Sequence, residues 1–184
     1  MTEANIVFDE VVRAAFAFME ARGFAASAAD PRNIVYQNGD VKLSVGWTDY
    51  SYEIEIYISP KPSQTFSLQA VLNFLSPAEA PHRTSQVGEA RKLAPVVGRL
   101  ADTVRTLPPK ALSGDASFFA EVDASQRQLA AAEHIRREII QARATADKAW
   151  RAGDYAQVVG AFNAVEPHLS DADRKKLDLA RRRV

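Results

Sequence analysis

The chain has 184 residues, of which 47% are hydrophobic and 25% charged, and its 23 basic residues balance 23 acidic ones. This length and composition predict one globular domain, alone or with an appendage, that buries a core without cross-links. The absence of cysteine excludes disulfides, thiolate metal sites, iron–sulfur clusters and a cysteine nucleophile. A neutral chain has no overall attraction to nucleic acid or to an anionic membrane.

The N-terminal residues predict a cytoplasmic protein. Glu3, Asp9 and Glu10 occupy a region in which a secretory signal needs basic residues. The apolar run at 14–19 is far shorter than a membrane-spanning helix. The lack of cysteine also suits a reducing compartment. We therefore expect a cytoplasmic location and no membrane partner.

A helix is predicted over residues 6–22, because apolar side chains recur there at three- and four-residue spacing. Gly23 ends it by supplying the left-handed conformation that helix C-termini use. The pattern then changes to alternation, which predicts strands at residues 33–37, 41–47 and 52–58. Together these strands are expected to form a three-stranded antiparallel meander.

Two turns set the expected register of this meander. The Asn-Gly pair at 38–39 suits a two-residue type I′ turn and places Tyr36 opposite Val41. A second turn, near Asp49 and Tyr50, sets the register of the next strand pair so that Val45 lies opposite Ile54. The apolar face is expected to lie under helices and to carry Val41, Leu43, Val45, Ile54, Ile56 and Ile58.

The rest of the chain is predicted to be helical. Ser67 caps a short helix that ends before Pro77. A longer helix begins near residue 86, and Pro95 inside it predicts a kink. Prolines and a Ser-Gly pair at 108–114 then mark the clearest break in the chain.

This break divides the chain into an α+β domain at 1–112 and a helical region at 113–184. Residues 125–152 are rich in good helix formers and predict one long helix, which ends at Gly153. Ser170 begins the final helix with the spacing of a capping box. The predicted fold class is α+β: a three-stranded antiparallel meander packed against helices, followed by an all-helical C-terminal region.

The sequence contains no recognisable catalytic or metal-binding motif. The phosphate-binding loop, the dinucleotide fingerprint and the nucleophile elbow are missing, and the three histidines lack metal-ligand spacing. We therefore predict no enzymatic activity, no cofactor and no metal. Glu53 and Glu55 stand about 7 Å apart on one strand face, which keeps open an enzyme with a site around them. Alternation alone explains both as a solvated sheet face.

Binding to another protein is the function that the sequence favours. Exposed aromatic residues near a hairpin tip are frequent in binding hot spots, and carboxylates speed the association of a basic partner. The expected register also brings Lys42 diagonally near Glu55. The candidate partner-binding residues are Lys42, Asp49, Tyr50, Glu53, Glu55 and Tyr57. Two alternatives stay open: a structural or oligomerisation module that uses the long helix, and a polar face covered by the C-terminal helices.

The C-terminal tail is strongly basic between Arg174 and Arg183. Cations in the last turns of a helix complement its dipole. Because no aromatic residues are interleaved with these cations, we expect no nucleic-acid partner. A homo-oligomer stays open.

The C-terminal segment resembles a single tetratricopeptide-type helical hairpin. The resemblance rests on Gly153-Asp154-Tyr155 and on the apolar residues that follow, Val158, Phe162 and Val165. Arrays of this kind need about three units to form a solenoid. One unit therefore implies a hairpin that packs on the body of the protein rather than a peptide-binding array.

The N-terminal half resembles small uncharacterised bacterial proteins that include immunity proteins of toxin systems. The residues that carry this resemblance are Phe18-Met-Glu-x-x-Gly23-Phe24, Val35-Tyr36 and Asp49-x-Ser51-Tyr52-Glu53-Ile54. The resemblance implies an immunity-type protein that neutralises a bacterial toxin by binding it. It assigns a role to no individual residue.

Overall fold

The computed structural model describes residues 3–48, 53–77, 87 and 92–184. The chain divides into two compact units, Met1–Ala124 and Ser125–Val184. The division falls inside helix α6 (Ala116–Ala152), later than the break predicted after residue 112. The reason is that the first turns of α6 pack into the core of the first unit.

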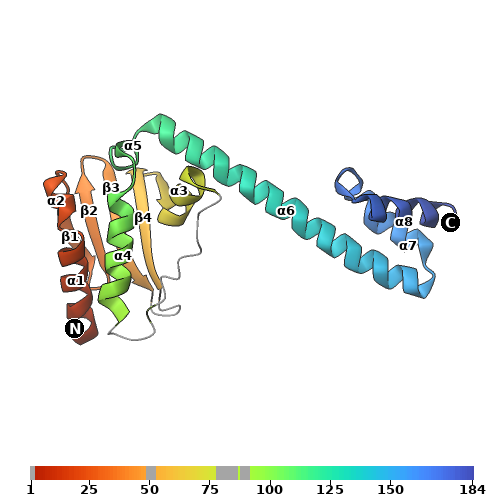
Figure 1. Cartoon of the computed structure of the whole chain (residues 1–184), viewed down its shortest axis with the longest axis horizontal. Helices are drawn as coiled ribbons and strands as arrows, with labels where there is room; N and C mark the ends of the chain where they lie inside the picture. The colour runs from red at the N-terminus through yellow and green to blue at the C-terminus, as the bar shows by residue number, and fades with distance from the viewer. Residues whose placement is uncertain (1–2, 49–52, 78–86, 88–91) are drawn as a thin grey trace. The chain divides into compact units, whose positions relative to one another are not determined.

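The first unit combines one sheet with helices (Figure 1). Its strands are β1 (Ala25–Asp30), β2 (Asn33–Asn38), β3 (Val41–Thr48), β4 (Glu53–Lys61) and β5 (Gln64–Ser67). Its helices are α1 (Glu3–Ala15), α2 (Phe18–Ala21), α3 (Leu68–Leu75), α4 (Leu93–Arg105), α5 (Pro109–Leu112) and the start of α6. The strands lie in chain order and pair antiparallel. The predicted α+β class is confirmed.

The sheet has five strands, so the prediction of three is wrong. β1 escapes prediction because its sequence, Ala-Ala-Ser-Ala-Ala-Asp, lacks β-branched and aromatic residues. β5 escapes prediction because Pro60 and Pro62 normally end a strand. Instead, β4 continues through Pro60 to Lys61, and the chain reverses so that Phe66 pairs with Ile58.

The predicted register of the first hairpin is wrong by two residues. Asn38 pairs with Val41, and Tyr36 pairs with Leu43. The hairpin loop therefore lies one residue later than predicted and begins at Gly39, whose φ is 57°. A shift of two residues keeps every side chain on its face, because the side-chain period of a strand is two.

The predicted register of the second hairpin is wrong in the same way. Val45 pairs with Ile56 instead of Ile54. Glu55 pairs with Gly46, which lies four residues from Lys42 on β3. Lys42 and Glu55 are therefore not diagonal neighbours. The apolar face is nevertheless the predicted one, and all six of its residues are buried: Val41, Leu43, Val45, Ile54, Ile56 and Ile58.

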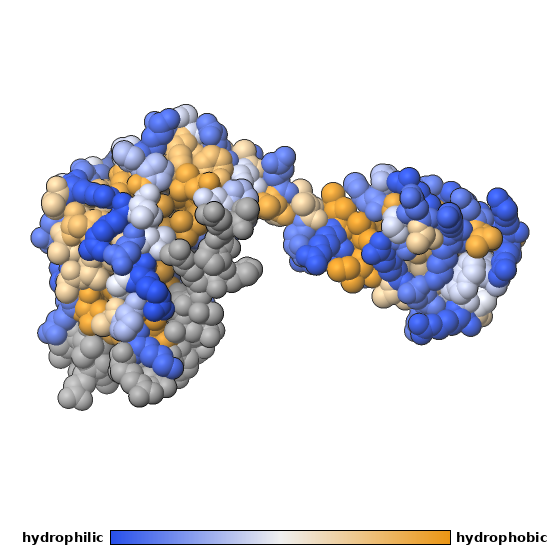
Figure 2. All heavy atoms as spheres, viewed as in Figure 1, coloured by the Kyte–Doolittle hydropathy of each residue, from blue (hydrophilic) through white to orange (hydrophobic). Residues whose placement is uncertain are grey.

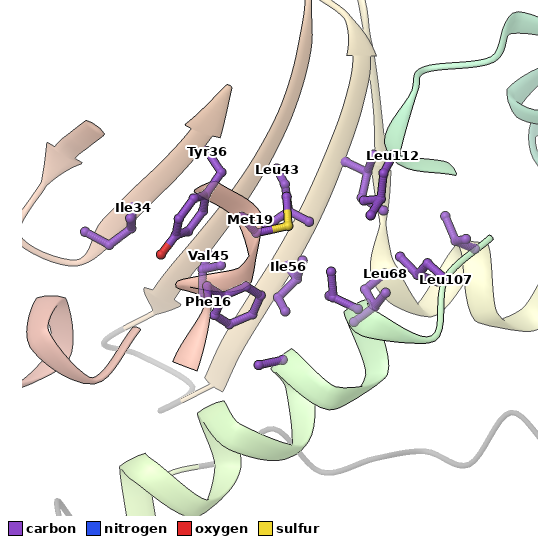
Figure 3. Packing of buried hydrophobic residues seen from close by; sticks show 14 of the residues in the cluster. Phe16, Met19, Ile34, Tyr36, Leu43, Val45, Ile56, Leu68, Leu107 and Leu112 are labelled. Carbon is purple, nitrogen blue, oxygen red and sulfur yellow. The ribbon is translucent and has the colours of Figure 1, made fainter. Parts of the chain in front are cut away.

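The apolar face of the sheet packs under α1, α3 and α4 (Figures 1 and 3). Tyr36 of β2 shows how far this cover excludes water. Its ring lies 5.8 Å from the ring of Phe16, and its hydroxyl donates to the carbonyl oxygen of Val12 at 3.4 Å. Burial raises the pKa of Tyr36 to about 12. The phenol is therefore a neutral component of the core.

Two helices of this layer differ from their predicted bounds. The helix expected at 6–22 is interrupted after α1 and resumes as α2, and Gly23 (φ 83°) ends it as predicted. α4 begins at Leu93, so Pro95 lies in its first turn, where a missing N–H breaks no helical bond. The kink predicted at Pro95 therefore has no cause. Residues 86 and 88–91 lie outside the described residues.

The second unit is helical, as predicted. Its elements are the rest of α6, α7 (Tyr155–Asn163), the 3-10 helix η2 (Glu166–His168) and α8 (Asp171–Arg181). Gly153 (φ 75°) reverses the chain, and Asp154 caps α7 by accepting from the N–H of Gln157 at 2.9 Å. Ser170 caps α8 by accepting from the N–H of Asp173 at 3.3 Å, so the N-cap predicted at Ser170 is confirmed.

Gly114, between α5 and α6, approaches the sheet closely. Its φ is 71°, and a Cβ there would lie 2.6 Å from Cγ2 of Val41 and 3.3 Å from the carbonyl oxygen of Pro60. We predict that Gly114→Ala lowers the free energy of unfolding by more than the roughly 1–2 kcal/mol of a left-handed alanine. Gly39→Ala is the matched control, because φ is 57° and no described atom lies within 4 Å. Equal losses in urea denaturation would contradict the close approach.

Two leucines of α8 test the core of the second unit. Leu177 is 1% exposed, whereas Leu179 is 46% exposed. We expect Leu177→Ala to destabilise the second unit by about 2–5 kcal/mol, since it leaves a cavity. Leu179→Ala should cost less than about 0.5 kcal/mol. Amide hydrogen exchange in α7 and α8 measures both effects. Indistinguishable exchange in the two variants would show that these helices do not share a core.

Candidate protein-binding face

The side of the sheet that faces away from the helices is polar. It carries Asn33, Val35 and Gln37 of β2, Lys42, Ser44, Gly46 and Thr48 of β3, Glu53, Glu55, Tyr57 and Ser59 of β4, and Thr65 of β5. We call these residues the polar sheet face. None of them is buried, because α1, α3 and α4 pack on the other side.

Glu55 lies at the centre of a small hydrogen-bonded group on this face. Its Oε2 accepts from the hydroxyl of Tyr57 at 3.0 Å and from Oγ1 of Thr48 at 3.4 Å. Tyr57 and Glu55 are two residues apart on β4 and therefore share a face. The strands thus hold one carboxylate and one phenol in a defined geometry at the surface.

A shallow hollow of about 520 Å³ lies on the polar sheet face around Gly46. Gly46 stands opposite Glu55 on one side and Asn33 on the other, and its missing side chain leaves room between them. A Cβ on Gly46 would make only ordinary contact, 3.8 Å from Oδ1 of Asn33. The hollow is therefore a feature of the strand pairing that a small side chain would partly fill.

Hydrogen-bond acceptors are concentrated around this hollow. Asp30 and Glu55 contribute carboxylates to its lining. Oδ1 of Asn33 is buried and accepts a hydrogen bond from none of the described residues. Arg32 lies over the ring of Trp47, with its Cζ 6.0 Å from the centroid. A partner that brings hydrogen-bond donors would find the carboxylates of Asp30 and Glu55 already positioned here.

The hydroxyl of Tyr57 is held in its neutral form. Partial burial raises the pKa of Tyr57 above its ordinary value of 10.0, and the hydrogen bond to Glu55 and the negative charge of that carboxylate raise it further. The phenol therefore stays a hydrogen-bond donor throughout the physiological range. Its half-buried ring offers apolar area beside a polar tip, the combination that suits an interface anchor.

Four predicted partner-binding residues lie on the polar sheet face: Lys42, Glu53, Glu55 and Tyr57. The structure brings Glu55 and Tyr57 into contact, whereas Lys42 lies at the far end of the face, opposite Ser59. Asp49 and Tyr50, which were also predicted, lie outside the described residues.

Several residues of this face and of the hollow on it escaped the prediction. The alternation of β3 already carried a signal for Thr48, since it continues the row that begins with Lys42. Asp30 and Thr65 had no such signal, because they lie on β1 and β5, the two strands that sequence patterns miss. Their place around the hollow depends on strand pairing alone.

Other kinds of site find less support. No group of three or more His, Asp or Glu side chains among the described residues is arranged to hold a metal ion. None of the helices that the structure describes combines the length and apolar character needed to cross a membrane. The basic tail makes contacts within the second unit: Arg181 binds Glu166 at 2.9 Å, and Arg183 donates to the hydroxyl of Tyr155 at 2.6 Å.

No protein-family model, curated protein or solved structure matches the chain. A functional proposal therefore has to start from the chemistry of its surfaces. The polar sheet face is the surface where acceptors, an aromatic residue and a hollow coincide.

The hydrogen bond between Tyr57 and Glu55 leads to a pH prediction. Because the folded-state pKa of Tyr57 is raised, this bond stabilises the fold fully below pH 10.0 and is lost as pH rises through the folded-state pKa. We expect Glu55→Gln to move the pKa of Tyr57 back toward its ordinary value, and the matched Glu53→Gln to leave it unchanged. NMR titration of ring-labelled tyrosine measures both. An unchanged pKa in Glu55→Gln would show that burial alone causes the shift.

Proposed function

We propose that the protein functions by binding another protein on its polar sheet face. The observation that carries the proposal is the hydrogen-bonded pair of Glu55 and Tyr57, beside a hollow that the described part of the first unit leaves to solvent. Both side chains project from β4, whose backbone is fixed by pairing with β3 and β5, so little order has to be gained when a partner docks. A wide, shallow hollow suits a protein surface better than a small substrate, which needs a deep cleft that excludes water.

The chemistry of this face selects a basic partner. Glu53, Glu55 and Asp30 carry negative charge on or beside it, and they outnumber the two cations there, Lys42 and Arg32. Such charges attract a basic surface during diffusion and therefore raise the association rate more than the final affinity. Tyr57 then supplies the aromatic contact that loses water on docking. The proposed order is electrostatic encounter first and burial of Tyr57 second.

The specific form of this proposal is an immunity-type protein whose partner is a bacterial toxin. It is supported by the resemblance of the N-terminal half to proteins that include toxin immunity proteins. The test is to express the proteins encoded by the genes adjacent to this chain's own gene, to identify any that stops growth, and to express it again together with this protein. Restored growth would support the specific form, whereas unrelieved toxicity would remove it and leave the general proposal of protein binding.

Charge reversal on the polar sheet face tests the general proposal. The partner is captured from the native cell, purified, and its association with the wild type is compared with that of Glu53→Lys, Glu55→Lys. We expect the association rate at low ionic strength to fall by about tenfold or more and to lose much of its salt dependence. Glu10→Lys, Glu20→Lys is the matched control, because both residues are exposed on the helical layer and the charge change is equal.

The outcomes separate clearly. A loss confined to the sheet variant, with unfolding by urea unchanged, supports the proposal. Equal rates in all three proteins would show that the partner binds elsewhere. An equal fall in association rate in both variants would show that the net charge of the protein, and not the polar sheet face, causes the effect.

A further inference from the structure

The middle of α6 exposes an apolar surface between the two cores, of which Ile139 packs partly against the second core. The first core ends at Val122 on this helix, and the first α6 residue that contacts the second core is Ile139. Leu129, between these two positions, is 53% exposed, and Ile140, next to Ile139, is 56% exposed. Figure 2 shows this apolar surface on α6 in orange. Large aliphatic side chains kept in water on one helix suggest an unfilled contact.

These side chains lie on one face of the helix. At about 100° per residue, Leu129, Ala132, Ile135, Ile139 and Ile140 fall within an arc of roughly 140°, the width of an ordinary core-facing stripe. We call these five residues the apolar arc. Two cations, Arg136 and Arg143, lie inside the same arc. Together with the arc residues other than Leu129, they line a groove along the helix.

The contact between α6 and α8 shows what this helix face binds. Asp173 of α8 accepts from Nε and Nη2 of Arg143 at 2.8 and 2.7 Å. One turn later in α8, Leu177 is buried in the core that Ala142 and Ala146 of α6 help to form. α8 is therefore recognised through a carboxylate paired with an arginine and an aliphatic side chain one turn away.

The apolar arc repeats this arrangement upstream. Ala132, Ile135 and Ile139 precede Ala142 and Ala146 at alternating three- and four-residue spacing, so they continue the same stripe. Arg136 precedes Arg143 by two turns, about 10.5 Å along the axis. Arg136 contacts Glu133 at 3.6 Å, and both side chains are more than half exposed, so this surface pair is easily exchanged.

We propose that the apolar arc docks an acidic amphipathic helix of another protein. The helix would place a carboxylate on Arg136 and an aliphatic side chain against Ile135 and Ile139. α8 makes the equivalent contacts further along α6, where Asp173 binds Arg143 and Leu177 enters the core. A second copy of this chain fits less well, because two such arcs would bring arginines together and the arc carries no acidic residue. Its three turns are also short for the roughly 800 Å² that each partner of a stable dimer buries.

This surface is independent of the polar sheet face and of the partner proposed for it. The arc lies in the second unit and selects an acidic helix, whereas the polar sheet face lies in the first unit and selects a basic surface. The two proposals can therefore fail separately, and each test uses variants in its own unit.

The probe for the test is a capped synthetic helical peptide with Glu and Leu at the four-residue spacing of Asp173 and Leu177. A second peptide has Lys in place of Glu. Binding to the full chain is measured by calorimetry, and NMR locates the peptide on α6. We expect the acidic peptide to bind at residues 129–140, and Arg136→Glu to weaken it by about tenfold or more, the size of one charge-assisted hydrogen bond.

Matched variants separate binding at the apolar arc from the effects of net charge and of nonspecific hydrophobic contact. Arg137→Glu changes the net charge equally but lies outside the arc, and it should leave the affinity unchanged. Ile140→Ser should weaken binding, whereas Leu179→Ser, which removes an exposed aliphatic side chain from α8, should not. Circular dichroism checks that each variant keeps its helices.

Three results would overturn the proposal. The first is equal affinity for the acidic and basic peptides. The second is an Arg136→Glu variant that binds the acidic peptide as the wild type does. The third is a dimer in sedimentation that Ile140→Ser abolishes, since a second copy would then occupy the arc.

Discussion

Burial of one face of an antiparallel sheet, with the other face left in water, is the constraint on which the first unit depends. An antiparallel sheet allows this because its hairpin connections need no helix on the second face. α1, α3 and α4 supply the cover, and Val12, Val71 and Val97 from these helices are fully buried. The alternation that sends Ile54 and Ile56 into this core sends Glu55 and Tyr57 to the opposite side. The candidate binding face is thus a direct consequence of how the core is built.

The start of α6 is bound into the same core by aromatic contacts. Phe119 packs against Phe66 of β5 at 5.0 Å, and Phe118 packs against Phe74 of α3 at 5.6 Å. The same helix later contributes Ala146 to the second core. One helix therefore belongs to two hydrophobic clusters, which is why the division between the units falls within a helix and not at the proline-rich break. It also explains why α6 has a middle section that neither core covers.

The two proposed surfaces have opposite chemistry, which the composition conceals. The polar sheet face presents carboxylates, whereas the apolar arc presents arginines among aliphatic side chains. Equal numbers of acidic and basic residues in the whole chain average these surfaces to zero. Specificity arises from where the charges lie, since a partner experiences the local field within about 10 Å at ordinary ionic strength. On this view the two surfaces select different partners.

The sequence by itself determined the features that depend on local conformation and period. These include the reversal at Gly153, the cap at Ser170 and the assignment of Ile54 and Glu55 to opposite faces of one strand.

The tertiary structure decided the features that local preference leaves equal in energy. Both hairpin registers moved by two residues, because such a shift preserves the alternation and only packing against the helices distinguishes the two pairings. β1 became a strand although its alanines have little β propensity, because β2 offers an edge whose backbone groups require partners. The contact between Glu55 and Tyr57 follows from their spacing, but the hollow beside them required Gly46, Asn33 and Glu55 to be aligned across three strands, which only the folded sheet provides.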